Sequence, residues 1–202
     1  MSATIAGPDG KPRCSWIGVS PEMCAYHDAE WGLPVGDDRR LFEKISLEAF
    51  QSGLSWRTIL AKRDNFRAAF HDFDVDRIAR FTERDIARLL QDEGIVRNRG
   101  KIEAVINNAR RVRELVDREG SLAAFIWGYE PDPKQLAAPQ TVTTSPEAIA
   151  LAKELKKRGW RFVGPTTAYA FMQAMGLVND HLTDCVVRAK VERARKRFAR
   201  PN

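Results

Sequence analysis

The chain has 202 residues, of which 44% are hydrophobic and 30% are charged. This composition excludes a fully disordered chain, which has too few apolar residues to form a core. No run of eighteen apolar residues occurs, so we expect neither a membrane-spanning helix nor a membrane partner. Residues 1–12 lack the apolar core of a signal peptide, and a cytoplasmic location is the default expectation.

The formal charge of +6 is concentrated at the C-terminus. Residues 186–202 contain seven Lys and Arg residues and one acid, whereas the rest of the chain has equal numbers of both signs. This basic tail is either an arm that contacts phosphates or a solubilising end, and composition does not separate the two. The odd number of cysteines, three, argues against a disulfide framework and for reduced thiols.

The periodicity of the apolar residues is helical almost throughout, which predicts an all-α fold without a sheet. Asp38 is predicted to cap a helix that carries Leu41, Ile45 and Ala49 on one face and ends near Gly53. Further helices are expected after Ser55, Asp74 and Thr82, each of which can serve as an N-cap. A longer amphipathic helix is predicted from about residue 98 to residue 118.

The C-terminal half begins with the Pro- and Thr-rich stretch 129–144, which is predicted to be an extended loop. Ser145 and Pro146 then form an N-cap followed by proline at the first helical position, opening a helix that ends near Arg158. A short apolar turn leads into another helix that continues to Gly176.

The segment from about 147 to 175 therefore has the pattern of a helix-hairpin-helix element. Its hairpin includes Val163 and Gly164, and Thr166 lies in the first turn of the second helix. Backbone N–H groups at such a helix N-terminus can bind a phosphate, and glycine lets the phosphate approach closely. An ordinary turn between two helices, with a capping glycine, accounts for the same pattern.

Two of the three histidines are associated with cysteines. Cys14 precedes His27 by thirteen positions, while His181 and Cys185 are spaced i, i+4 and so share one helix face. Together the four side chains suit a tetrahedral zinc site, although a coincidental spacing or a catalytic Cys with a partner His stays open. Phosphate-binding loops, zinc-protease helices and nucleophile elbows are absent from the sequence.

Glu48 lies at the margin of the apolar face of its predicted helix. A carboxylate in this position is either paired in a salt bridge or binds a ligand in a pocket. The neighbouring aromatic residues Trp16, Tyr26, Trp31 and Trp56 are either core residues or a surface on which a planar base can stack.

These motifs together resemble one family, that of 3-methyladenine DNA glycosylase I, within the helix-hairpin-helix glycosylase superfamily. The resemblance runs from about residue 13 to residue 185 and rests on the segments RCSW (13–16), YHDAEWG (26–32), LEAFQSGLSW (47–56), KKRG (156–159) and GLVNDH (176–181). It implies a single all-α glycosylase domain over 13–185, a flexible extension over 1–12 and the basic tail over 186–202.

The resemblance also implies an activity, a metal and partners. The chain is expected to be a monomeric repair enzyme that flips 3-methyladenine out of alkylated duplex DNA and removes it by hydrolysis, releasing free 3-methyladenine. The implied ligands of one structural Zn²⁺ are Cys14, His27, His181 and Cys185. Cys14 and His27 lie near the N-terminus and the other two near the C-terminus, so the metal would join both ends.

The implied base pocket has Glu48 as its catalytic carboxylate, with Trp16, Tyr26, Trp31 and Trp56 around it. The resemblance matches Gly53 and Leu54 to a wedge that fills the stack after base flipping, and the hairpin pattern described above adds Val163, Gly164 and Thr166 as DNA-binding residues. Met23 departs from the aromatic residue expected at that position of the pocket. The alternative function is a zinc-stapled DNA-binding module that senses alkylated bases without cutting.

Overall fold

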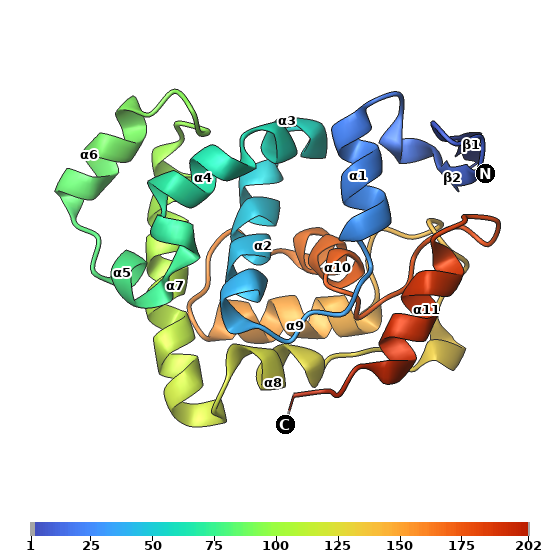
Figure 1. Ribbon diagram of the computed structural model, residues 1–202. Helices are drawn as coiled ribbons and strands as arrows, with labels where there is room; N and C mark the ends of the chain where they lie inside the picture. The colour runs from blue at the N-terminus through green and yellow to red at the C-terminus, as the bar shows by residue number, and fades with distance from the viewer. Residues whose placement is uncertain (1–2, 202) are drawn as a thin grey trace.

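The computed structural model describes residues 3–201 and is mostly helical (Figure 1). The first helices are α1 (Pro21–Ala29), α2 (Asp38–Gln51), α3 (Trp56–Ala61) and α4 (Arg63–Ala69). The middle of the chain forms α5 (Val75–Ala79), α6 (Glu83–Gln91), α7 (Arg99–Glu119) and α8 (Leu122–Trp127). The last helices are α9 (Pro146–Lys157), α10 (Pro165–Ala174) and α11 (Arg188–Arg197). Single 3₁₀ turns form η1 (Ser15–Ile17), η2 (His71–Phe73) and η3 (Pro133–Gln135).

The expectation of a fold without a sheet is wrong at the N-terminus. Strands β1 (Thr4–Ala6) and β2 (Pro12–Cys14) form a small antiparallel hairpin in which Thr4 is paired with Cys14. Strands of three residues are too short to show the alternating pattern that identifies a strand in a sequence. The predicted flexible extension over 1–12 therefore contains a paired strand, and residues 1 and 2 lie outside the described part of the chain.

Several predicted helix starts are confirmed by their capping bonds. Ser55 accepts a hydrogen bond from the backbone N–H of Thr58, and Ser145 accepts one from that of Ala148. The start of α2 is one residue earlier than predicted, because the cap is Asp37, which accepts from the N–H of Arg40. Two adjacent aspartates are equally good caps in a sequence, so the pattern could not choose between them.

Asp38, which was predicted to be this cap, forms a different contact. Its carboxylate accepts hydrogen bonds from the backbone N–H groups of Leu122 and Ala123, at 3.0 and 2.8 Å. These are unpaired donors in the first turn of α8. Asp38 thus fixes the start of α8 against the start of α2, 84 positions earlier in the sequence.

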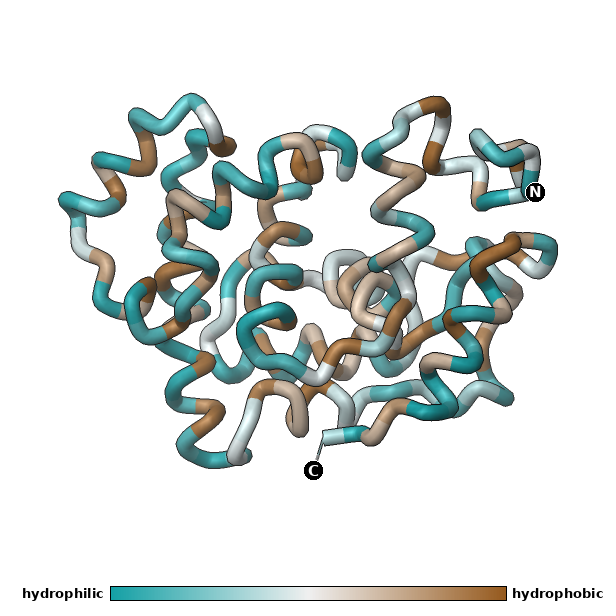
Figure 2. Tube along the Cα trace, viewed as in Figure 1, coloured by the Kyte–Doolittle hydropathy of each residue, from teal (hydrophilic) through white to brown (hydrophobic). Residues whose placement is uncertain are grey.

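The core lies between α2, α7, α9 and α10. The apolar stripe of α7 packs against α5, α6 and α8, and α10 packs against both α9 and α2. Figure 2 shows hydrophobic and hydrophilic residues alternating along the turns of α7, as a half-buried helix requires. Among the described residues, no helix is both long enough and apolar enough to cross a membrane.

The N-terminal hairpin β1–β2 and helix α11 lie on the same side of the molecule (Figure 1). The backbone N–H of Val186 donates to the carbonyl of Pro12 at 2.9 Å, which joins the segment before α11 to β2. The predicted basic tail is therefore largely a helix packed on the fold. Arg195 of α11 is buried, donates to the carbonyl of Gly176 and pairs with Glu130 at 2.9 Å.

Candidate functional site

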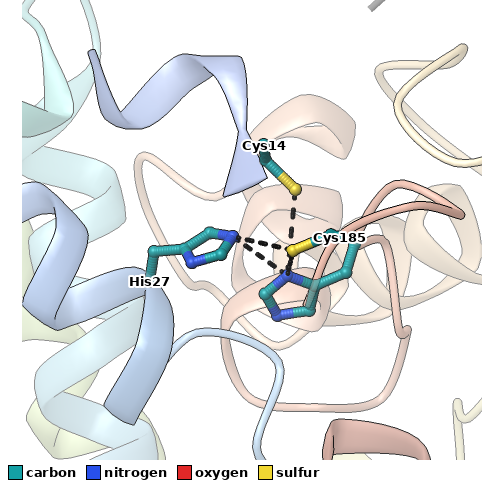
Figure 3. Close-up of side chains that lie close together, drawn as sticks. Cys14, His27 and Cys185 are labelled. Atoms are coloured by element: carbon teal, nitrogen blue, oxygen red, sulfur yellow. Dashed lines mark hydrogen bonds between the residues drawn. The ribbon is translucent and has the colours of Figure 1, made fainter. Parts of the chain in front are cut away.

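A buried cluster of two cysteines and two histidines joins the N-terminal segment to the segment before α11 (Figure 3). Cys14 comes from the end of β2 and His27 from α1, while His181 and Cys185 lie in the segment before α11. All four side chains are buried, and their ligand atoms lie within 4.8 Å of one another. The structure thus brings together the four residues that the sequence singled out, although His181 and Cys185 lie in a turn-rich segment rather than on a helix.

The distances from His181 Nδ1 to the other three donor atoms are close to those of a tetrahedral site. His181 Nδ1 lies 3.1 Å from His27 Nε2, 3.5 Å from Cys185 Sγ and 3.8 Å from Cys14 Sγ. Zinc bonds of about 2.0–2.3 Å give tetrahedral edges of roughly 3.3–3.8 Å. Contacts with Cys14, His181 and His27 lower the pKa of the Cys185 thiol, which favours the thiolate that binds metals. The cluster therefore has the chemistry and spacing to hold a metal ion.

Both histidine rings are oriented by outer partners. His27 Nδ1 lies 2.7 Å from Asp28 Oδ1, and Asp28 is itself bound by the guanidinium of Arg13 at 2.7 Å. His181 Nε2 lies 3.0 Å from the carbonyl oxygen of Trp31. With these nitrogens donating to oxygen, Nε2 of His27 and Nδ1 of His181 carry the lone pairs that face the cluster.

A cavity of about 610 Å³ opens beside this cluster. It lies between η1, α1, the end of α2, the start of α3 and one face of α10, and residues of the loop 140–143 line one side. The cavity is lined by all five predicted pocket residues, Trp16, Tyr26, Trp31, Glu48 and Trp56. Thr166, predicted as a DNA contact, and Met23 also line it.

The aromatic rings of the cavity fall into two groups. Trp16 and Trp31 pack edge to face, with ring centroids 5.0 Å apart, and rest against the histidines of the metal cluster. Tyr26 and Trp56 have centroids 5.2 Å apart and lie beside Glu48. Glu48 is 7% exposed, so a charged carboxylate is held almost out of water at the wall of the cavity.

Sequence reasoning missed the partner of Glu48, which is Lys44 one helical turn earlier. Lys44 Nζ lies 2.8 Å from Glu48 Oε1, 2.7 Å from the hydroxyl of Tyr26 and 3.2 Å from the ring centroid of Trp56. Burial lowers the pKa of Lys44, and the nearby Glu48 opposes this shift. A signal existed, since Lys44 shares the i, i+3, i+4, i+7 stripe with Leu41, Ile45 and Glu48.

Asp180 is a second acid of the cavity. Its carboxylate accepts hydrogen bonds from the backbone N–H of Gln140 at 2.9 Å and from Gln173 Nε2 at 2.5 Å. Burial raises the pKa of Asp180, and these bonds partly offset the shift. On the sequence and the resemblance alone, Asp180 is either an acid that supports the attack of water or only the neighbour of His181.

The two turns predicted to contact DNA are both accessible in part. Gly53 has φ of +79°, which favours glycine, and the adjacent Leu54 is 42% exposed. Gly164 is the N-cap of α10 and has open space where a Cβ would stand. The side chain of Val163 is buried in the core, so only its backbone is available to a ligand.

The second turn is fixed by a residue that sequence reasoning missed. The side-chain amide of Asn108 on α7 accepts from the N–H of Arg161 and donates to the carbonyl of Arg161, both at 2.9 Å. Asn108 is buried, and the turn is thereby held to α7 from one side. The next residue, Phe162, has a positive φ of 58° and is exposed.

Comparison with known proteins decides the family. A sequence model of the methyladenine glycosylase family matches residues 16–189. The chain belongs to this family. The match spans both the cavity and three of the four cluster residues, with Cys14 just before its start.

Individual relatives agree with this assignment. DNA-3-methyladenine glycosylase 1 of Escherichia coli (strain K12) is 48% identical over 177 residues, which are 86% of this chain and 95% of the relative. A crystal structure of 3-methyladenine DNA glycosylase I superposes with a TM-score of 0.81 at 50% identity, covering 86% of this chain and 98% of that one. A Staphylococcus aureus structure on 3-methyladenine recognition has a TM-score of 0.82 at 37% identity, with 87% and 95% covered.

Proposed function

We propose that this protein is a DNA glycosylase of base-excision repair that removes 3-methyladenine from alkylated duplex DNA. The observation that carries this proposal is the cavity, in which the nearly buried carboxylate of Glu48 lies among four aromatic rings. Such a cavity suits a planar cation, because the rings attract positive charge at their faces and the carboxylate balances it. The relatives named for the same activity support the choice of base.

The chemistry demands little acid catalysis. Adenine methylated at N3 is cationic in DNA and already a good leaving group, so recognition of the base dominates catalysis. In the proposed reaction, the bond between the sugar carbon and the base breaks, and its electron pair leaves with the base, which becomes neutral. Water adds to the sugar carbon and loses a proton. The products are free 3-methyladenine and an abasic site.

Each pocket residue has a proposed part in holding the base. The base rotates out of the duplex and stacks on Trp56 and Tyr26, and Glu48 accepts hydrogen bonds from its exocyclic amine. Trp16 and Trp31 close the opposite side of the cavity. Glu48 thus both orients the base and stabilises its positive charge.

The exposed turns are proposed to hold the DNA. Leu54, presented by the Gly53 turn, fills the space that the flipped base leaves in the stack. Phosphate binds at the N-terminus of α10, where Gly164 leaves room and the first-turn N–H groups, including that of Thr166, lack intrahelical partners. In this proposal α9, the turn fixed by Asn108 and α10 form a helix-hairpin-helix element.

We propose that the metal of the cluster is zinc. Two sulfur and two nitrogen donors at tetrahedral spacing suit Zn²⁺, and four protein ligands leave no position for water, which makes the site structural. Cys14 and His27 would then be fixed to His181 and Cys185 across more than 150 positions of sequence. The need for reduced thiolates supports a cytoplasmic location, and a pocket built from one chain supports a monomer.

The test is release of free base from methylated duplex DNA, resolved by chromatography. We expect the wild type to release 3-methyladenine and Glu48→Gln to release at least roughly tenfold less, since the carboxylate charge is lost while its shape is kept. Glu43→Gln is the matched control, because Glu43 lies on the same helix but pairs with Arg67 outside the cavity. It should keep wild-type release.

A non-catalytic DNA-binding module is the competing function. Saturable quenching of tryptophan fluorescence by free 3-methyladenine, without release of base by a folded and metal-loaded wild type, would favour that module. Equal release by the wild type and Glu48→Gln would instead remove Glu48 from the proposed mechanism.

A further inference from the structure

Lys44 is a buried charged residue beside this site that the proposed reaction does not use. It comes from α2 and its side chain is 7% exposed. The ammonium contacts Glu48, Tyr26 and Trp56 at once, at the distances given above. These are the three residues proposed to hold the flipped base. Glu48, Tyr26 and Trp56 form one wall of the cavity. A buried lysine in this position affects every interaction that the base makes with this wall.

The ammonium contacts this wall from the side opposite the large cavity. Tyr26 and Trp56 line both the large cavity and a second, smaller one of about 50 Å³, whereas Lys44 lines only the smaller cavity. A base stacked on the cavity face of Trp56 would therefore have Lys44 on the other side of the ring. The base would not displace Lys44, and both would be present together.

Of the other charged residues that line the smaller cavity, Arg40 is exposed and the remaining four form two ion pairs. Arg63 binds Glu30 through two hydrogen bonds of 2.6 and 2.9 Å, and Arg67 binds Glu43 at 2.8 Å. Lys44 is paired with Glu48. The charge of Glu48 is thus already balanced by a fixed cation before any base enters the cavity.

A carboxylate paired with a cation discriminates less between cationic and neutral bases than an unpaired carboxylate does. A lone buried carboxylate attracts a cationic base strongly and a neutral base weakly, because charges interact over several ångströms where water is excluded. An ammonium beside the carboxylate repels the cation and so cancels much of this difference. Lys44 also lies over one face of Trp56. Its ammonium interacts with the same π electrons that would attract a cationic base on the other face.

We propose that Lys44 is a specificity-determining residue that lowers the preference of the pocket for cationic over neutral bases. This inference rests on the proposed function, since it takes Glu48, Tyr26 and Trp56 as the base pocket. It adds that the attraction of Glu48 for a cationic base is weaker than that of an unpaired carboxylate. Lys44 does not contact the reacting bond in this proposal.

The experiment compares two probes of nearly equal shape at pH 8, by quenching of tryptophan fluorescence. Free 3-methyladenine is the neutral probe, and 3,9-dimethyladenine, whose N9 methyl replaces the sugar, is the cationic one. We expect Lys44→Met to raise the ratio of cation to neutral affinity at least tenfold over the wild type. Lys44→Arg, which keeps the charge, should stay within threefold of the wild-type ratio.

Lys44→Gln provides a second uncharged variant that can still donate hydrogen bonds to Glu48 and Tyr26, in case Lys44→Met does not fold. It should raise the ratio in the same direction. A ratio within twofold of the wild type in a folded uncharged variant would overturn the proposal and leave the base pocket intact. A wild type that binds neither probe would overturn the proposed function, and the role of Lys44 with it.

Discussion

The two walls of the cavity are supported in different ways. Trp16 and Trp31 rest on the histidines of the metal cluster, with centroid distances of 5.3 Å from Trp16 to His27 and 4.6 Å from Trp31 to His181. The other wall, which contains Tyr26 and Trp56, rests on the single ammonium of Lys44.

The first support joins segments from opposite ends of the chain, whereas the second lies within α1, α2 and α3. A long-range support restricts how the whole chain folds, and a local ion pair sets the charge that a ligand meets. We therefore expect substitutions in the metal-supported wall to change stability most, and substitutions in the lysine-supported wall to change ligand preference most.

The largest effect is expected for Cys185→Ser. Under the proposed zinc assignment this variant loses the metal, and the buried side chains of Cys14, His27 and His181 lose their shared partner. Structural zinc sites contribute on the order of 10 kcal/mol in small domains. We expect a loss of more than about 4 kcal/mol, seen as a melting temperature lower by more than roughly 8 °C.

The measurement combines metal analysis of the purified protein with thermal denaturation followed by circular dichroism. Cys24→Ser is the matched control, because Cys24 is a free cysteine outside the cluster. It should keep one metal per chain and the wild-type melting temperature. Equal metal content in both variants would contradict the assignment of Cys185 as a ligand.

A smaller loss of stability is expected from a substitution on α11, which lies on the same side as the metal-supported wall. Arg195 is buried, donates to the carbonyl of Gly176 and pairs with Glu130, which Arg200 also binds at 2.8 Å. Arg195→Met leaves Glu130 without its buried cation and should cost about 3 kcal/mol in the free energy of unfolding measured in urea.

The exposed Arg193 on the same helix offers the matched substitution. Arg193→Met should change the free energy of unfolding by less than about 0.5 kcal/mol. Similar values for both variants would mean that α11 is a solubilising tail and not part of the fold.

This contrast also shows what the sequence can predict. Local signals such as the Ser145 and Pro146 pair identified α9, because capping depends on a few neighbouring residues. The same pair of residues at Ser20 and Pro21 begins α1, a helix that the sequence patterns did not lead us to predict. The cluster residues were correctly grouped by their types and by the resemblance, although their spacing alone does not distinguish a metal site from a coincidence or a catalytic Cys and His pair.

Features that depend on tertiary contacts could not be predicted in this way. Positive charge along 186–202 suggested a tail, but which arginines are buried depends on acceptors such as the carbonyl of Gly176. Lys44 is polar, and the usual rule places lysine in solvent. Its burial is possible because Glu48, Tyr26 and Trp56, from three separate helices, converge around the ammonium.

The smallest effect is expected on α10, a helix that lines the cavity and whose Tyr169 is buried. Burial, followed by the charges of Asp180 and Glu147, raises the pKa of Tyr169 to about 12. Because this pKa is above the value of about 10 in the unfolded chain, the neutral phenol stabilises the native state fully below pH 10. That contribution is lost as the pH rises from about 10 to about 12.

Tyr169→Phe removes this dependence. Between pH 9 and pH 11 the wild type should lose about 1 kcal/mol more in its free energy of unfolding than the variant, since one pKa unit corresponds to about 1.4 kcal/mol. Urea unfolding at the two pH values measures the difference. Burial also raises the pKa of Tyr26, so both proteins should lose some stability at high pH, and only the difference between them reports on Tyr169. Parallel losses would show that the hydroxyl of Tyr169 reaches water in the native protein.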